Sequence, residues 1–228
     1  LYIKILENRV STLFIHHQNN NYGKDSAYTH EHGEESSKDS GKTGRCFTGS
    51  GPVTWNHNHH GDGICDLNGN VWEWNAGMRL VGGEIQIIPY NNAAMGSKCD
   101  MSASSTLWKA IKADGSLVEP GTAGTLKWDW VSGKIQLTSG AITYKTDSGV
   151  GGQYKDMTLA SGLTAPEIAK MLLLYPDEPN GDYAGDYHWF NPVGERLPVC
   201  GGGWNNGANA GVFYLDLSYP RSIAYWYI

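Results

Sequence analysis

Short segments in which apolar and polar residues alternate dominate the middle of the chain. Residues 71–74 (VWEW) and 84–88 (EIQII) predict two strands. Residues 106–118 carry an Asp-Gly pair between two apolar runs, which is typical of a β-hairpin. Three further short segments, each bounded by Gly or Ser, predict a meander of strands: 125–133, 134–140 and 141–146.

Residues 164–175 (TAPEIAKMLLLY) form the clearest helical pattern. Thr164 can cap the helix, Pro166 suits its first turn, and Glu167 stands third after the cap. Pro176 stops the helix, and residues 177–195 predict a loop.

The N-terminal part of the chain has no clear period. Residues 1–15 predict either one helix or a helix followed by a strand, and residues 16–50 predict a long polar surface loop. A loop of this length needs a rigid body to lie against, or it is disordered. Without a repeat or a low-complexity linker, we expect residues 1–228 to form a single α+β domain with much irregular loop.

Composition excludes several classes of protein. The net charge is −6 without a dense Lys/Arg block, which argues against nucleic-acid binding. No apolar run approaches the roughly 18 residues that a membrane helix needs, so no membrane insertion is expected. Nine Trp and 13 Tyr stand against only four Phe, and these amphipathic rings suit half-wet surfaces as well as cores.

Metal and thiol chemistry finds little support in the sequence. The four cysteines (46, 65, 99 and 200) include no CxxC pair, so they predict buried, mostly reduced thiols, with one bridge as an alternative. His57, His59 and His60 lie near Asp62, but three histidines in a Gly- and Asn-rich loop more often cap turns than bind a metal. We therefore expect no metal site there.

The C-terminal segment alternates most regularly. Phe213, Leu215 and Leu217 are predicted to face the core, whereas the residues between them and beyond Pro220 are predicted to face outward. The outward set is Tyr214, Asp216, Ser218, Tyr219, Ile223, Tyr225 and Tyr227. Its composition is similar to that of an antibody paratope, in which Tyr gives contact area and Ser gives adaptable polar contacts. The alternative is that these Tyr are ordinary strand residues.

Two stretches resemble a known fold family. DLNGNVWEW (66–74) resembles a core motif of formylglycine-generating enzymes and their C-type-lectin-fold relatives, which places Trp72 and Trp74 in the scaffold. GGGWNNGANAGVF, followed by PRS and a final Ile, resembles the variable proteins of diversity-generating retroelements in phages and bacteria. The resemblance implies a C-type-lectin-like fold whose segment 200–228 is a variable ligand-binding region. In that family a reverse transcriptase rewrites adenines in this segment, chiefly in AAC (Asn) codons.

The genetic code agrees with this resemblance. One adenine change in AAC gives Tyr, Asp, Ser, Ile, His or Thr, and every outward residue named above belongs to that set. Asn205 and Asn206 fit unrewritten codons, Gly203 needs two changes, and Trp226 fits none although it can still contact a ligand. The predicted ligand-binding residues are therefore the outward set together with Gly203, Asn205, Asn206 and Trp226.

An oxidase is the competing interpretation from another class. Formylglycine-generating enzymes use two cysteines just after the GGSW-like motif, whereas here Cys200 precedes GGG and no Cys follows it. We therefore expect a protein that is not an enzyme. The resemblance also implies a calcium site made of the backbone oxygens of Asp66, Gly69 and Val71 with the Glu73 carboxylate. We favour the alternative, in which Glu73 accepts backbone hydrogen bonds in a tight turn and no cofactor is bound.

Together these features predict a diversified receptor-binding protein. The expected setting is the tip of a phage tail fibre in the virion, where the chain binds a bacterial cell-surface receptor, either protein or glycan. Tail fibres are commonly trimers, so a homotrimer is expected from the setting. The alternatives are display on a bacterial cell surface and a divergent formylglycine-generating-type oxidase.

Overall fold

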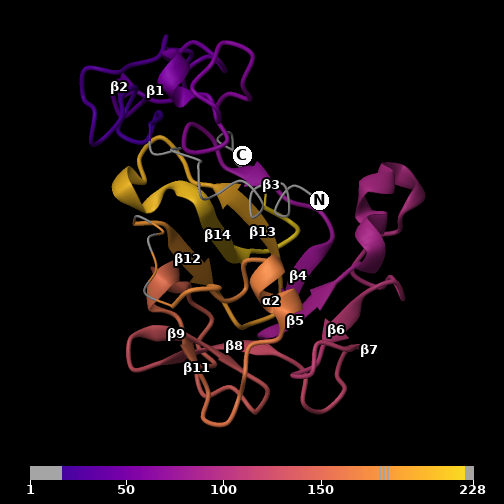
Figure 1. Cartoon of the computed structure of the whole chain (residues 1–228). Coiled ribbons are helices and arrows are strands. Elements are labelled where there is room, and N and C mark those ends of the chain that lie inside the picture. Colours follow the sequence, from indigo (N-terminus) through magenta and orange to yellow (C-terminus); the bar gives the residue numbers. More distant parts are fainter. Residues whose placement is uncertain (1–16, 180, 182, 184, 224–228) are drawn as a thin grey trace.

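The computed structural model describes residues 17–179, 181, 183 and 185–223, and it is rich in strand (Figure 1). Strand accounts for 31% of the residues and helix for 12%, with irregular loops between them. The prediction for residues 1–15 concerns residues outside the described part of the chain.

The strands are β1 (Lys38–Asp39), β2 (Lys42–Thr43), β3 (Glu73–Trp74), β4 (Met78–Val81), β5 (Glu84–Ile87), β6 (Lys109–Ile111), β7 (Leu117–Val118), β8 (Lys127–Val131), β9 (Lys134–Thr138), β10 (Val150–Gln153), β11 (Thr158–Leu159), β12 (Tyr187–Phe190), β13 (Glu195–Gly201) and β14 (Gly211–Tyr219). The helices are η2 (Val53–Trp55), η3 (Pro89–Lys98), η4 (Tyr154–Asp156), α2 (Glu167–Met171) and η5 (Gly207–Asn209).

One long sheet runs in the order β10-β12-β14-β13-β4-β5-β8-β9-β11. Most neighbours are antiparallel, and β12–β14 and β9–β11 are parallel. Two-residue turns at Gly82–Gly83 and Ser132–Gly133 close the hairpins β4–β5 and β8–β9, and all four residues have positive φ. Positive φ at both central positions is the turn geometry that matches the twist of paired strands.

Alternation located several of these strands correctly. The segments 84–88, 125–133 and 134–140 contain β5, β8 and β9, and the Asp114–Gly115 turn joins β6 to β7. The segment 71–74 forms only the two-residue β3.

Two predictions in the second half of the chain were wrong. Residues 141–146 form no strand, because the backbone N–H groups of Thr143 and Tyr144 donate to the Asp129 carboxylate at 2.9 Å each. Residues 177–195 contain β12, which pairs with β10 and β14 inside the sheet. Its alternation was too short to be separated from the Gly-rich sequence before it.

The predicted helix 164–175 is real but shorter. It spans Glu167–Met171, and Pro166 takes the cap position in extended conformation in place of Thr164. Leu173 has φ +56°, which ends the helix. The following carbonyls of Leu174 and Tyr175 accept hydrogen bonds from the Trp128 indole and the Tyr154 hydroxyl, both at 3.0 Å.

The main core lies against the sheet between these elements. Its largest fully buried side chains include Trp128, Tyr154 and Phe190, with Leu80 and Ile85 from the β4–β5 hairpin. A second, smaller cluster of Ile88, Ala93, Cys99 and Trp108 supports the arm that contains η3, which stands apart from the sheet in Figure 1.

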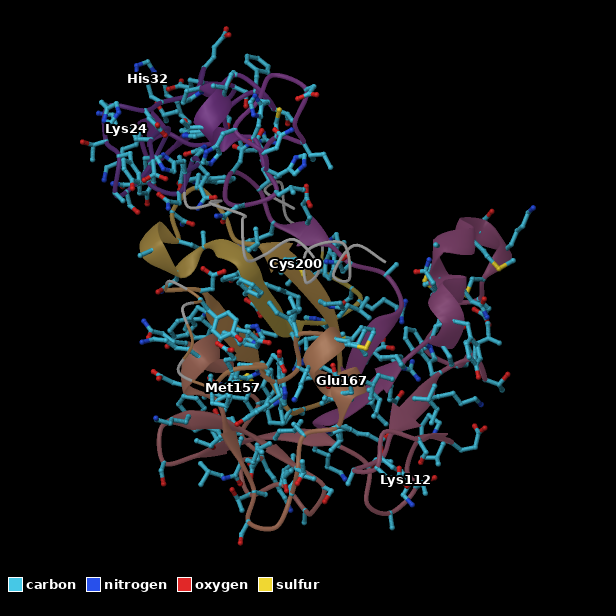
Figure 2. The ribbon with its side chains drawn as sticks, in the orientation of Figure 1. Lys24, His32, Lys112, Met157, Glu167 and Cys200 are labelled. Carbon is cyan, nitrogen blue, oxygen red and sulfur yellow. The ribbon has the colours of Figure 1, made fainter. Side chains whose placement is uncertain are left out.

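The predicted polar loop 16–50 belongs to a lobe at one end of the molecule. This polar lobe, residues 17–66, contains only β1, β2 and η2 as regular structure. Lys24 and His32 lie in it, and Lys112 lies at the opposite end (Figure 2). The lobe is fixed by backbone bonds to the C-terminal part of the chain, from Tyr22 N–H to the Trp204 carbonyl and from Gly207 N–H to the Asn20 carbonyl, both at 2.8 Å.

Two buried side chains of the β12 segment hold the start of β14. Asp186 accepts the Phe213 N–H through Oδ2 at 2.7 Å, and His188 donates from Nε2 to the Phe213 carbonyl at 2.7 Å. Burial raises the pKa of Asp186 well above its usual range and lowers the pKa of His188 to about 3. Both groups therefore favour their neutral forms and serve as buried hydrogen-bond partners of one residue.

Gly211 leaves the space that the Asp186 carboxyl occupies, because a β-carbon at Gly211 would overlap that carboxyl. We predict that Gly211→Ala displaces Asp186 from Phe213 and lowers the free energy of unfolding by roughly 2–4 kcal/mol. Urea denaturation measures this change. Gly61→Ala is the control, since nothing lies within 4 Å of its β-carbon position, and an equal loss in both variants would contradict the proposed contact.

Candidate ligand-binding surface

β14 is an inner strand between β12 and β13, and both of its faces are covered over most of its length. Phe213, Leu215 and Leu217 are buried, which confirms the predicted inward set. Tyr214 and Asp216 were predicted to face outward, but their side chains are only 2% and 5% exposed. That prediction was wrong, because alternation separates the two faces of a strand without showing that either is exposed.

The second face of β14 is a buried polar layer. The Tyr214 hydroxyl lies 3.4 Å from Asp216 Oδ2, and the Ser218 N–H donates to Asp216 Oδ1 at 2.8 Å. Burial is the main cause that raises the pKa of Asp216 to about 6 and the pKa of the neighbouring Cys200 thiol to about 12. These groups are therefore framework residues that cannot meet a ligand directly.

Beyond this layer the last residues of β14 are partly exposed to solvent. Ser218 and Tyr219 are half-buried, and the turn after Pro220 exposes Arg221 before the half-buried Ile223. The Arg221 guanidinium pairs with both carboxylate oxygens of Glu195 at 2.8 and 2.9 Å, which fixes the turn to β13. The predicted site residues Tyr225, Trp226 and Tyr227 lie outside the described residues.

The Gly-rich turn between β13 and β14 lies at the start of β14, where Gly201 pairs with Gly211. Asn205 is exposed, Gly203 is buried, and Asn206 is half-buried. Asn206 Oδ1 accepts two hydrogen bonds, from the Gly203 N–H at 2.6 Å and from the Trp72 indole N–H at 2.9 Å. A β-carbon at Gly203 would lie 3.4 Å from that indole nitrogen.

Trp72 connects the turn to the strand. Its ring centroid lies 5.5 Å from that of Tyr219, while its indole donates to Asn206. The sequence motif predicts that Trp72 and Trp74 belong to the scaffold, and in the structure Trp72 is half-buried and Trp74 is 40% exposed. Their i, i+2 spacing predicts a shared face but gives no information on whether that face is covered. We call Trp72, Asn205, Asn206, Tyr219 and Ile223 the C-terminal ridge.

The histidine-rich loop forms an internally bonded turn. His57 Nδ1 accepts the Ile64 N–H at 2.7 Å, and the Asn56 amide donates to the His60 carbonyl at 2.6 Å. This is the turn-capping role expected for His57. Among the described residues, no group of three or more His, Cys, Asp or Glu side chains gathers closely enough to hold a metal.

The residues implied as a calcium site bring two carboxylates near each other. Burial and the Asp66 charge raise the pKa of Glu73, and Asp66 Oδ2 also accepts the Gly49 N–H at 3.1 Å. Carboxylate and carbonyl oxygens are the ligand types that calcium prefers. Glu73 is exposed, and these two carboxylates belong to no larger group of metal-ligating side chains among the described residues.

The cysteines form no disulfide. Cys46 and Cys99 are buried, and Cys65 and Cys200 are half-buried. Burial is also the main cause that raises the pKa of Cys46 to about 11, so this thiol and that of Cys200 stay protonated at neutral pH. The predicted burial holds for Cys46 and Cys99, and the redox state of the thiols stays a prediction.

Helices of the described part of the chain are all too short or too polar to cross a membrane. The chain matches no protein-family model and no curated protein sequence. The assignment of a function therefore rests on the residues and their arrangement.

The two asparagines of the ridge should respond differently to truncation. We predict that Asn206→Ala lowers the free energy of unfolding by about 1–3 kcal/mol, because the Gly203 N–H and the Trp72 indole both lose their acceptor. Asn205→Ala should change it by less than about 0.5 kcal/mol, because Asn205 is exposed. Chemical denaturation of both variants measures the difference, and equal stabilities would show that Asn206 does not hold the turn.

Asp216 should make stability depend on pH. Folding raises its pKa from 3.8 to about 6, so the folded protein keeps a proton that the unfolded chain releases. Its contribution to stability is present below the unfolded pKa and is lost as the pH rises through about 6. Relative to wild type, Asp216→Asn should therefore gain roughly 1–3 kcal/mol between about pH 4 and pH 7. Urea denaturation at several pH values tests this, and a constant difference would contradict the assigned burial.

Proposed function

We propose that this chain is a diversified receptor-binding protein with a C-type-lectin-like fold, and that the C-terminal ridge is its binding surface. The observation that supports this most is that Trp72 joins the Asn206 turn to Tyr219. Through this contact, a scaffold motif and two separate parts of segment 200–228 meet at one partly exposed surface. The proposed setting is a phage tail-fibre tip that contacts a bacterial cell-surface receptor.

The chemistry of the ridge suits recognition. Tyr219 and Trp72 offer aromatic area with polar tips, and such residues often supply the binding energy at interfaces. Asn205 provides a short polar side chain beside them, as paratopes do. Asn205, Tyr219 and Ile223 are also residues that AAC codons give unchanged or after one adenine change, and all three side chains are at least partly exposed.

Burial separates these residues from the other predicted contacts. Tyr214 and Asp216 lie inside the polar layer of β14. Asn206 belongs to the ridge and is half-buried like Tyr219, but its Oδ1 holds the turn. In this proposal Tyr214 and Asp216 support the ridge, and Asn206 positions it without touching the receptor. Rewriting them would change stability together with specificity, whereas rewriting Asn205 or Tyr219 would change chiefly specificity.

The neighbouring DNA distinguishes the proposal from its rivals. A reverse transcriptase gene beside a near-copy of the codons for 200–228, differing only at adenines, would support a diversified protein. Tail-fibre genes next to it would favour the virion over display on a bacterial surface. Their absence, with copper-dependent oxidation of a cysteine peptide by the purified chain, would support the formylglycine-generating-type oxidase.

Tyr219 should carry much of the binding energy. We predict that Tyr219→Ala weakens adhesion of the purified protein to host cells by about 30-fold or more, the loss expected of an aromatic anchor. The melting temperature should fall only slightly, because Tyr219 is half-buried at the end of its strand. Flow cytometry with labelled protein measures adhesion, and Lys112→Ala, at the opposite end of the molecule, is the control. Normal adhesion of the Tyr219 variant, or equal losses in both, would refute the proposed surface.

A further inference from the structure

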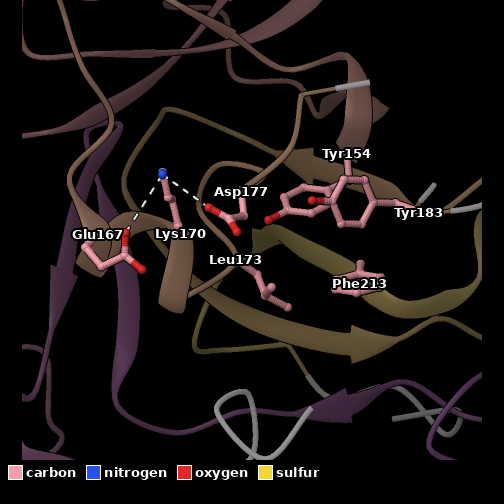
Figure 3. A pocket seen from close by; sticks show the side chains of 7 residues that line it. All are labelled: Tyr154, Glu167, Lys170, Leu173, Asp177, Tyr183 and Phe213. Atoms are coloured by element: carbon pink, nitrogen blue, oxygen red, sulfur yellow. Dashed lines mark ion pairs between the residues drawn. The ribbon is translucent and has the colours of Figure 1, made fainter. Parts of the chain in front are cut away.

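A pocket of about 210 Å³ opens between α2 and the start of β14 (Figure 3). Phe213 lines the pocket, and Tyr219 of the ridge lies six residues further along the same strand. At about 3.4 Å per residue, roughly 20 Å separates them. No described residue that lines the pocket belongs to the ridge, so the pocket is treated as a second site with its own ligand contacts.

Aromatic rings form the inner wall of the pocket. Tyr183 packs edge-on against Tyr154 and Phe213, with ring centroids 4.9 and 5.0 Å apart. Leu173 completes the apolar part of the lining. The hydroxyl of Tyr154 donates to the Tyr175 carbonyl at 3.0 Å, so this ring is fixed and presents carbon to the pocket.

Charged groups form the rim. Lys170 Nζ lies 3.2 Å from Asp177 Oδ1 and 3.8 Å from Glu167 Oε2, and Figure 3 shows the ammonium between the two carboxylates. Both carboxylates are largely exposed, at 73% and 75%, so their remaining oxygens are open to a ligand. Burial is the main cause that raises the pKa of the Tyr183 phenol, and the charges of Asp177 and Glu178 add to it, which places both carboxylates near the aromatic wall.

An aromatic wall next to a rim with one ammonium and two carboxylates favours a neutral, polyhydroxylated ring as the ligand. An anion would meet the two carboxylates, and a cation would have to displace Lys170 from between them. A neutral ring with hydroxyl groups can donate to Asp177 and Glu167 and accept from Lys170, while its C–H face lies on the aromatic wall. The volume is below the roughly 300–1,000 Å³ of sites that take drug-sized molecules, which limits the occupant to one ring.

We propose that this pocket binds a single neutral pyranose sugar, with Asp177 and Lys170 contacting its hydroxyl groups and Tyr183 contacting its C–H face. A small pocket with a few exposed polar contacts gives weak affinity, with a dissociation constant on the order of 1 mM. Such a site would add a sugar contact to a protein that, in the function proposed above, holds its receptor at the ridge.

Saturation-transfer NMR on the purified chain tests the proposal with the methyl glycosides of glucose, galactose and mannose. We expect transfer to at least one of them, and no transfer to benzylamine or phenylacetate, which carry a ring with the wrong charge. Asp177→Asn should weaken the sugar at least about fivefold by removing one charged acceptor. Glu178→Gln is the matched control, since it removes an exposed carboxylate one residue away that does not line the pocket.

Each outcome either supports or overturns the proposed sugar site. Transfer that Asp177→Asn reduces and Glu178→Gln leaves unchanged supports the sugar site. Failure of all three glycosides, binding of the amine or the acid instead, or an equal effect of both substitutions overturns it. Because Asp177 and Glu178 are exposed, neither variant should unfold. Tyr219→Ala should leave sugar binding unchanged. A pocket that does not bind sugar can therefore be distinguished from a ridge that does not bind the receptor.

Discussion

The position of β14 depends on the hydrogen bonds that Asp186 and His188 make to the backbone of Phe213. All three residues are buried, and a buried polar group left without a partner costs on the order of 1–3 kcal/mol. Gly211 makes the arrangement possible, since any side chain there would occupy the space of the Asp186 carboxyl. Both candidate surfaces depend on this constraint, because Phe213 lines the pocket and the far end of β14 supplies Tyr219.

A second set of contacts connects the ridge to the rest of the chain. The polar lobe bonds to Trp204 and Gly207 on one side of the Gly-rich turn, and Asn206 bonds to Trp72 on the other. The turn is therefore held from both sides, while Asn205 between these anchors stays exposed. A surface that changes its residues while keeping its shape needs this division between held backbone and exposed side chains.

The sequence predicted local features better than burial. Turn chemistry and alternation located β5, β8 and β9, because these depend on neighbouring residues. Alternation also identified Phe213, Leu215 and Leu217 as core, but it could not show that Tyr214 and Asp216 are covered too, since burial depends on segments distant in sequence. The pocket was missed for the same reason: Lys170, Asp177 and Phe213 come together only in the folded chain.

In the proposed function, the ridge residues that are at least partly exposed, Asn205, Tyr219 and Ile223, can vary on a fixed framework. Two displayed libraries test it directly, one randomised at Asn205, Tyr219 and Ile223 and the other at Asn206, Tyr214 and Asp216, each scored by the fraction of clones that resist protease. The account predicts that most clones of the first library and few of the second stay folded. Equal fractions in both libraries would contradict it.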